Sequence, residues 1–239
     1  MLGDGRFLVQ MYYADCRSAM LNVCSMFAQI FGLLRDILPL PDKILRMQFN
    51  IDDISELIRR RRAVFPKFYI PGEPVDRAVI EQLLENANQA PTHKLTEPWR
   101  FHVFHSEESR RRLGAYMSDF YRKNTPPEQF SEEKMKKNGE NPLLAGAVIA
   151  IIMQRDPAES IPEFEEIAAV AMAVQNMWLT CAALGLGCYW STPRAALTAD
   201  EFLGLAPGQR CLGLFYLGWH QMPELPGKRR PVAEKVIWL

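Results

Sequence analysis

The order of apolar and polar residues along the chain predicts both helices and strands. Apolar residues at helical spacing predict one helix over residues 74–90 and another over residues 107–123, each with a single apolar face. A shorter helix is predicted after Met47, where Asp52 or Asp53 can cap the first turn. Each of these helices is expected to pack its apolar face against a core.

Four short apolar runs are interpreted as strands, over residues 100–105, 147–153, 211–219 and 232–239. The second run, AVIAIIM, contains no polar residue, which is typical of a strand buried on both faces. Helices and strands intermix without strict alternation along the chain. We therefore expect an α+β fold with layers of helix and sheet rather than a doubly wound fold.

The most apolar helix is predicted between Ser160 and Gly185. Ser160 and Glu163 have the spacing of a capping box, and Gly185 and Gly187 are suited to end a helix. Residues 167–190 carry no charge and are long enough to span a bilayer. Two adjacent amide side chains near the middle of this run and the capped entry favour a buried helix of a soluble protein, so no membrane span is expected.

Two other segments are interpreted from polar residues. Thr198 and Glu201 repeat the capping-box spacing and predict a short helix. Residues 123–141 are rich in lysine, glutamate and proline and predict a long polar loop. Loops of this length are often functional, so this one is expected to shape a binding pocket.

Residues 1–46 share no pattern with the rest of the chain. Pro39 and Pro41 end the first helical stretch of the chain, and the segment that follows reads as a natural beginning. We interpret residues 1–46 as an N-terminal extension of unknown role and residues 47–239 as one domain. The apolar stretch in the extension is short, interrupted by polar residues and preceded by acidic residues, so no signal peptide or anchor is expected.

Composition narrows the class of protein. The 239 residues are 48% apolar, which allows a substantial core, and 28 basic residues balance 28 acidic ones. This balance does not indicate a nucleic-acid partner. Five cysteines without C-x-x-C spacing argue against a disulfide framework and a structural zinc site, and favour the reducing cytoplasm.

Two basic clusters are candidates for a binding site. Arg59–Arg62 lies at the end of a predicted helix, where successive positions are about 100° apart, so at least one arginine should turn inward. Lys228–Arg230 precedes the last predicted strand. Each cluster is either a solvated surface run or a phosphate site, because guanidinium groups bind phosphate oxygens through two parallel hydrogen bonds. Sequence alone leaves open whether the clusters meet.

Few other residues indicate chemistry. His93 and Lys94, at a helix-to-strand junction, are candidates for a general acid or base. The sequence has no nucleophile elbow, no histidines at metal-ligand spacing, no glycine-rich dinucleotide motif and no Walker lysine, so no metal site is expected. Trp190, beside Ser191 and Thr192, is either a core residue, which is more common, or the flat wall of a site.

Four segments, taken in order, resemble the flavin-dependent nitroreductase family. RRRAVFPKFY resembles its Arg-Arg-Ser motif, and NQAPTHKLTEPWRF resembles its Ala-Pro-Ser…Gln-Pro-Trp-x-Phe motif. AVQNMWLTCAALGLGCYWST resembles its central helix and the loop after it, and KRRPVAEKVIWL its C-terminal segment. The resemblance covers residues 50 to 239 and is nearest to small nitroreductases with a His-Lys pair after Ala-Pro.

The resemblance implies a three-layer α/β/α sandwich around a central mixed, mainly antiparallel sheet. It also implies an intertwined homodimer with FMN at the subunit interface and a last strand that reaches across to the partner. The implied cofactor contacts are Arg61, Arg62 and Ala63 at the phosphate and ribityl end, Gln89 and His93 near the flavin, Tyr189, Trp190, Ser191 and Thr192 along the isoalloxazine ring, and Lys228, Arg229 and Arg230 as a second phosphate clamp.

The implied activity is that of a cytoplasmic, FMN-dependent oxidoreductase that takes hydride from NAD(P)H. The acceptor would be a small molecule such as a nitroaromatic, a quinone or an activated alkene. No catalytic side chain is expected, because the flavin carries the hydride, but a backbone N–H near Ser191 or Thr192 would face flavin N5.

The motifs of this chain depart from the family pattern at several positions. Ala63 replaces a serine, Phe65 stands where a basic residue is frequent, and Leu95 and Glu97 replace an asparagine and a glutamine. The alternatives are a dehalogenase or flavin-breakdown branch of the family, and a flavin-binding or interaction protein without turnover. Ala63 keeps the last alternative open.

Overall fold

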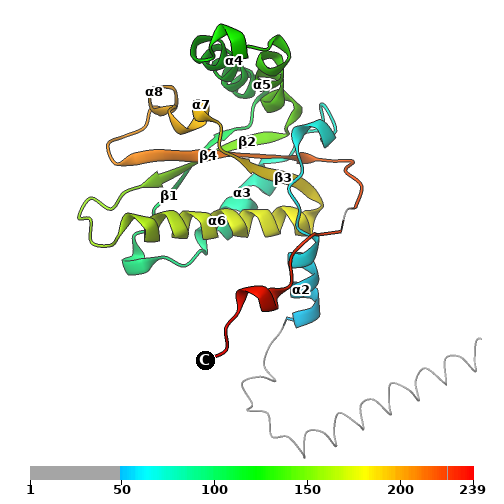
Figure 1. Ribbon diagram of the computed structural model, residues 1–239, viewed down its shortest axis with the longest axis vertical. Helices are drawn as coiled ribbons and strands as arrows, with labels where there is room; N and C mark the ends of the chain where they lie inside the picture. The colour runs from blue at the N-terminus through cyan, green and yellow to red at the C-terminus, as the bar shows by residue number, and fades with distance from the viewer. Residues whose placement is uncertain (1–48, 225) are drawn as a thin grey trace, which may run out of the picture. The chain divides into compact units, whose positions relative to one another are not determined.

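The computed structural model describes residues 49–224 and 226–239. The chain divides into one unit that ends at Ile51 and a second unit from Asp52 to Leu239. The predicted N-terminal extension, its prolines and the proposed start at Met47 lie outside the described residues. The second unit has the expected α+β architecture, with helices on both faces of one sheet (Figure 1).

The sheet contains four strands in the order β1-β2-β4-β3. They are β1 (Trp99–Phe104), β2 (Ala147–Gln154), β3 (Leu186–Ser191) and β4 (Gln209–Trp219), and all three pairings are antiparallel. The expected central strand β2 is buried along nearly its whole length. The predictions for β1, β2 and β4 are therefore confirmed, whereas β3 lies where a loop was expected.

Helices cover the two faces of the sheet as separate layers. One face packs against α3 (Arg77–Asn88) and α6 (Glu163–Leu184), and the other against α4 (Glu107–Asn124) and the short α7 (Arg194–Leu197). Successive residues of β2 alternate between the two cores, with Ile149 in the first and Val148 in the second. The remaining elements are α2 (Ile51–Arg60), α5 (Glu132–Leu144), α8 (Asp200–Leu203) and the short 3-10 turns η2 (Pro66–Phe68), η3 (His93–Leu95), η4 (Pro127–Gln129) and η5 (Val232–Lys235).

The long apolar helix is confirmed, but its predicted cap is wrong. Gly185 ends α6 in the left-handed conformation, with φ 75°. The residue before the first turn is Pro162, because the hydroxyl of Ser160 instead donates to Asp156 Oδ2 at 2.5 Å. The same competition by a local partner explains why Thr198, whose hydroxyl donates to the Arg194 carbonyl, does not cap α8.

The uncharged run over residues 167–190 is not one element. It divides at Gly185 into the end of α6 and the edge strand β3. By length and composition alone, α6 could cross a membrane, as many core helices of soluble proteins could. One side of α6, including Val170, Val174 and Met177, is fully buried in the core on the α3 side of the sheet.

Two other predictions are wrong. Residues 123–141 are not a loop, because α5 occupies most of the segment after Ser131 caps its first turn. Residues 232–239 form η5 and an extended tail rather than a strand. A strand requires a neighbouring ladder of hydrogen bonds, and the described part of the chain offers the tail no such partner.

Helices α4 and α5 approach each other closely at Gly114 and Gly139. A Cβ atom at Gly114 would lie 2.2 Å from the Gly139 carbonyl oxygen, which is backbone and cannot rotate away. We expect Gly114→Ala to push α5 outward and to lower the free energy of unfolding by about 1–3 kcal/mol, measured by urea denaturation. A loss below about 0.5 kcal/mol, as for a surface substitution, would contradict this packing.

Candidate functional site

The arginine run at the end of α2 turns one guanidinium inward, as expected. Arg61 Cζ lies 4.9 Å from the ring centroid of Trp178 on α6, a cation–π contact. The indole N–H of Trp178 also donates to the Arg62 carbonyl at 3.0 Å. Because Trp178 belongs to a rigid core helix, it holds both arginines in place. Arg59 and Arg60 instead pair with Glu56 at the exposed surface.

The chain after α2 runs along the edge strand β3. The Val64 N–H donates to the Cys188 carbonyl at 2.9 Å, and the buried Tyr69 hydroxyl donates to the Val64 carbonyl at 3.0 Å. Gly187 allows this close approach, because a Cβ there would lie 2.7 Å from Val64. The position of Arg61 is therefore fixed by both α6 and the sheet.

The two basic clusters meet, which the sequence left open. Gly227 lies against the Arg62 side chain, where a Cβ atom would be 2.4 Å from Nη2. Burial first, and then the positive charges of Arg229 and Arg62, lower the pKa of Arg61. No carboxylate among the described residues forms an ion pair with Arg61 or Arg229. Two neighbouring cations, Arg61 and Arg229, that form no ion pair in the described residues provide a site for an anion, and planar guanidinium groups suit a phosphate.

Of the other predicted contacts in these clusters, Ala63 is exposed beside Arg62, and Lys228 and Arg230 are exposed on the C-terminal segment. Arg230 contributes its carbonyl oxygen to Lys235 at 3.1 Å. Within this group, Arg61, Arg62 and Arg229 are the residues that the structure brings together.

A cavity of about 330 Å³ lies beside the arginine segment. The residues that line it are Phe65, Pro66, Lys67, Lys137, Asn141 and Tyr189. The rings of Phe65 and Tyr189 contact each other at 5.0 Å between centroids. Tyr189 also stacks on Tyr216 of β4 at 5.1 Å, and burial raises the pKa of its hydroxyl. The cavity therefore has rigid aromatic walls and two lysines.

Tyr189 to Thr192 were predicted to lie along the isoalloxazine ring. They do not all face one side, because side chains alternate along the strand β3. Tyr189 faces the cavity, whereas Trp190 packs on the opposite core and donates its indole N–H to the Leu212 carbonyl at 3.0 Å. Trp190 thus takes the core position that was the more common alternative. Ser191 is the last residue of β3, paired with Leu214, and Thr192 is exposed beyond it.

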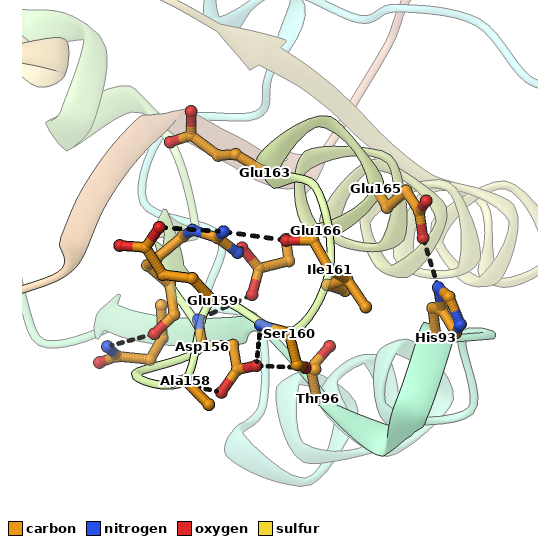
Figure 2. A network of polar contacts seen from close by, with 12 residues as sticks. His93, Thr96, Asp156, Ala158, Glu159, Ser160, Ile161, Glu163, Glu165 and Glu166 are labelled. Carbon is orange, nitrogen blue, oxygen red and sulfur yellow. Dashed lines mark hydrogen bonds and ion pairs between the residues drawn. The ribbon is translucent and has the colours of Figure 1, made fainter.

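The junction after α3 forms a second region with predicted site residues. Gln89 ends α3 and is exposed. His93 Nδ1 lies 2.6 Å from Glu165 Oε2, which accepts its hydrogen bond (Figure 2). The Lys94 ammonium donates to the Ser160 carbonyl at 2.9 Å. Lys94 and Leu95 have positive φ values of 50° and 55°. Such backbone strain in non-glycine residues is characteristic of functional sites.

A buried carboxylate anchors the end of α6 that holds this junction. Glu166 is fully buried and accepts hydrogen bonds from the Arg155 guanidinium and from the Asp156 N–H at 2.7 Å (Figure 2). Arg155 also donates to the Ile161 carbonyl at 2.9 Å. The first turn of α6, and with it Glu165, is therefore fixed relative to the sheet.

The two regions lie at opposite ends of α6. Glu165 contacts the junction and Trp178 contacts the arginines, and the rise of an α-helix places these two positions about 20 Å apart. Within one chain, His93 and Arg61 therefore do not converge on one site, although the sequence motifs predicted a common ligand for them.

Sequence reasoning missed several residues of the site. Lys137 and Asn141 were placed in a loop, although their spacing of four is that of neighbours on one helix face. Ser131 followed by acidic residues was a usable signal for the start of α5. Glu165 and Trp178 carried no local signal, because their partners are distant in the sequence. The described residues contain no group of side chains suited to a metal ion.

Comparison with known proteins places this chain in a family. The model of the nitroreductase family matches residues 58–219. "Putative NAD(P)H nitroreductase YfhC" of Bacillus subtilis is 30% identical over 186 residues, which are 76% of this chain and 92% of that protein. A "5,6-dimethylbenzimidazole synthase" of Rhodospirillum rubrum is 26% identical over 73% of this chain and 87% of that protein.

Solved structures agree with this relationship. A nitroreductase-like family protein from Bacillus cereus is 27% identical, with a TM-score of 0.64 over 78% of this chain and 95% of that chain. A "putative nitroreductase in complex with FMN" from Desulfovibrio desulfuricans is 24% identical, with a TM-score of 0.60 over 80% of this chain and 98% of that chain. The chain belongs to the nitroreductase family.

Proposed function

We propose that this protein is an FMN-dependent oxidoreductase that transfers hydride from NAD(P)H to a small-molecule acceptor. The observation that carries the proposal is the meeting of Arg61, Arg62 and Arg229 beside the edge strand β3. A nitroaromatic, a quinone or an activated alkene would serve as the acceptor. For a nitro group, NAD(P)H and one proton yield NAD(P)⁺, a nitroso group and water.

The residues present fit FMN at its phosphate end. Arg61 and Arg229 supply donors and form no ion pair among the described residues, and Trp178 fixes the first of them. When bound, FMN would accept a hydride and pass it on. The chain's own groups would bind, orient and shield the reactants, with Ser191 and Thr192 at the open end of β3.

The distance between the two predicted contact regions supports a homodimer. If the His93 junction of one protomer meets the arginine cluster of its partner, the contacts at both ends of α6 serve one cofactor. Several large apolar side chains on α6 and on the C-terminal tail are exposed in the single chain and suit such an interface, among them Phe164, Met172, Ile237 and Trp238. The extended residues 236–239, which pair with no strand in the single chain, could then pair with the partner.

A flavin-breakdown enzyme is the second candidate, because one relative is named 5,6-dimethylbenzimidazole synthase. Such an enzyme would consume reduced flavin rather than pass its hydride to an exchangeable acceptor. Sustained NAD(P)H oxidation that depends on an added acceptor, with FMN recovered intact, would distinguish the reductase from this candidate. We place either enzyme in the cytoplasm, with residues 1–46 as an extension to the reductase domain.

The experiment that tests the proposal begins with the visible spectrum of the purified full chain. We expect a yellow protein with about one FMN per chain, bleached by NADH or NADPH without oxygen and recoloured by 1,4-benzoquinone. Sedimentation should give a dimer. A protein that cannot be loaded with FMN would contradict the proposal. One that binds FMN but is not bleached by either nucleotide would instead be a flavin-binding protein without turnover.

A further inference from the structure

We propose that the cavity between α5 and η2 binds the electron acceptor and selects aromatic acceptors that carry a negative charge. We call it the two-lysine cavity, after Lys67 and Lys137, which line it with Phe65, Pro66, Asn141 and Tyr189. This inference rests on the proposed reductase function and names the substrate class for it.

The shape and walls of the two-lysine cavity suit a small planar molecule. Its volume of about 330 Å³ is near the lower limit for small-molecule sites, roughly 300–1,000 Å³. Phe65 is half exposed and leans against Tyr189 with 56° between the ring planes. Tyr189 is fixed in turn by stacking on Tyr216. A single aromatic ring can therefore pack against a preformed surface.

The charges of the cavity are not balanced by acidic residues. Neither Lys67 nor Lys137 forms an ion pair in the described part of the chain, and no carboxylate lines the cavity. Glu140, on the same helix, pairs instead with Lys136 at 3.7 Å. The Lys67 ammonium lies 4.8 Å from the centroid of the Phe68 ring, which holds it near the cavity. Two cations at one concave surface attract an anion.

The lysines are separate from the cations expected to hold a phosphate. Arg61 contacts Trp178 on the α6 side of the sheet, whereas Phe65 contacts Tyr189, which packs with the core on the α4 side. The short segment between them crosses the edge of β3 through the hydrogen bond from Val64 to Cys188. The cavity therefore adjoins the cofactor site and leaves its lysines for a second ligand, with the Asn141 amide as a further polar contact.

The test compares two acceptors that differ in charge. Calorimetry on the protein as purified would measure binding of 4-nitrobenzoate and of uncharged 4-nitrobenzamide without NAD(P)H. We expect the acid to bind about tenfold more tightly than the amide, because each exposed lysine contributes roughly two- to fivefold. Lys67→Met with Lys137→Met should remove this preference and leave binding of the amide unchanged. The KM values of the two acceptors should change in the same way.

Lys136→Met is the matched control, because it removes one charge from the same helix outside the cavity. It should retain the preference for the acid. The proposal is overturned if the unaltered protein binds both compounds equally, if the double variant keeps the preference, or if the control loses it too. A failure to reduce either compound while the acid still binds more tightly would count against the reductase function and not against this cavity.

Discussion

Replacing Arg61 with methionine is expected to weaken FMN binding about a hundredfold. A hydrogen bond to a charged group contributes about 1.5–3 kcal/mol, and the upper part of this range corresponds to two orders of magnitude in affinity. Arg61 is half-buried and held over Trp178, and it lies near the positive charges of Arg229 and Arg62. Arg61 itself forms no ion pair among the described residues. Titration of the FMN-free protein with FMN, followed by quenching of flavin fluorescence, would measure the change.

Arg60→Met is the control for this substitution. Arg60 is the neighbouring residue, but it is exposed and paired with Glu56 at 2.7 Å, so its loss should change FMN affinity by no more than about twofold. Equal effects of the two substitutions would mean that overall charge, rather than the placed guanidinium, attracts the ligand. Because Arg61→Met also removes a cation–π contact of about 0.5–1 kcal/mol, circular dichroism must show that the variant is folded.

The fold could be predicted where local pattern and tertiary environment agree. The apolar run of β2 and the helical periodicity of α3 and α4 identified each element to within a few residues. Strand β3 was missed, because six residues after a long helix carry little periodicity, and its identity comes from pairing with β4. α5 was missed because the lysine, glutamate and proline content of residues 123–141 suggested a loop, whereas packing against α4 stabilises the helix.

The kind of site could be predicted from the sequence, but the arrangement of its residues could not. Arginines suited to phosphate could be identified from their sequence, but only the structure joins Arg62 to Gly227 across the chain. The motif match treated Arg61 and His93 as contacts of one ligand, and the length of α6 separates them in one protomer. A match to a sequence motif does not say which subunit of a dimer supplies the contact.

The substitution Glu166→Gln is expected to lower the free energy of unfolding by about 3 kcal/mol. The side chain is fully buried and paired with Arg155, and breaking such a pair leaves the guanidinium with only the exposed Glu159, 3.8 Å away, as a counter-charge. The glutamine oxygen can still accept a hydrogen bond from the Asp156 N–H. The loss in the free energy of unfolding therefore measures the effect of removing the charge alone. Glu166→Ala should lose more, because that N–H is also left unpaired. Urea denaturation, followed by tryptophan fluorescence, would measure both variants.

Glu163→Gln is the matched control, because Glu163 lies in the same first turn of α6 and also faces an arginine. Its contact with Arg210, at 3.0 Å, is about half exposed on both sides, so the loss should stay below about 1 kcal/mol. Both substitutions remove one negative charge near the positive end of the helix dipole. The dipole contribution is therefore the same in both variants and cancels when they are compared. Equal losses for the two variants would therefore show that the dipole, and not the buried pair with Arg155, anchors the end of α6 that holds His93.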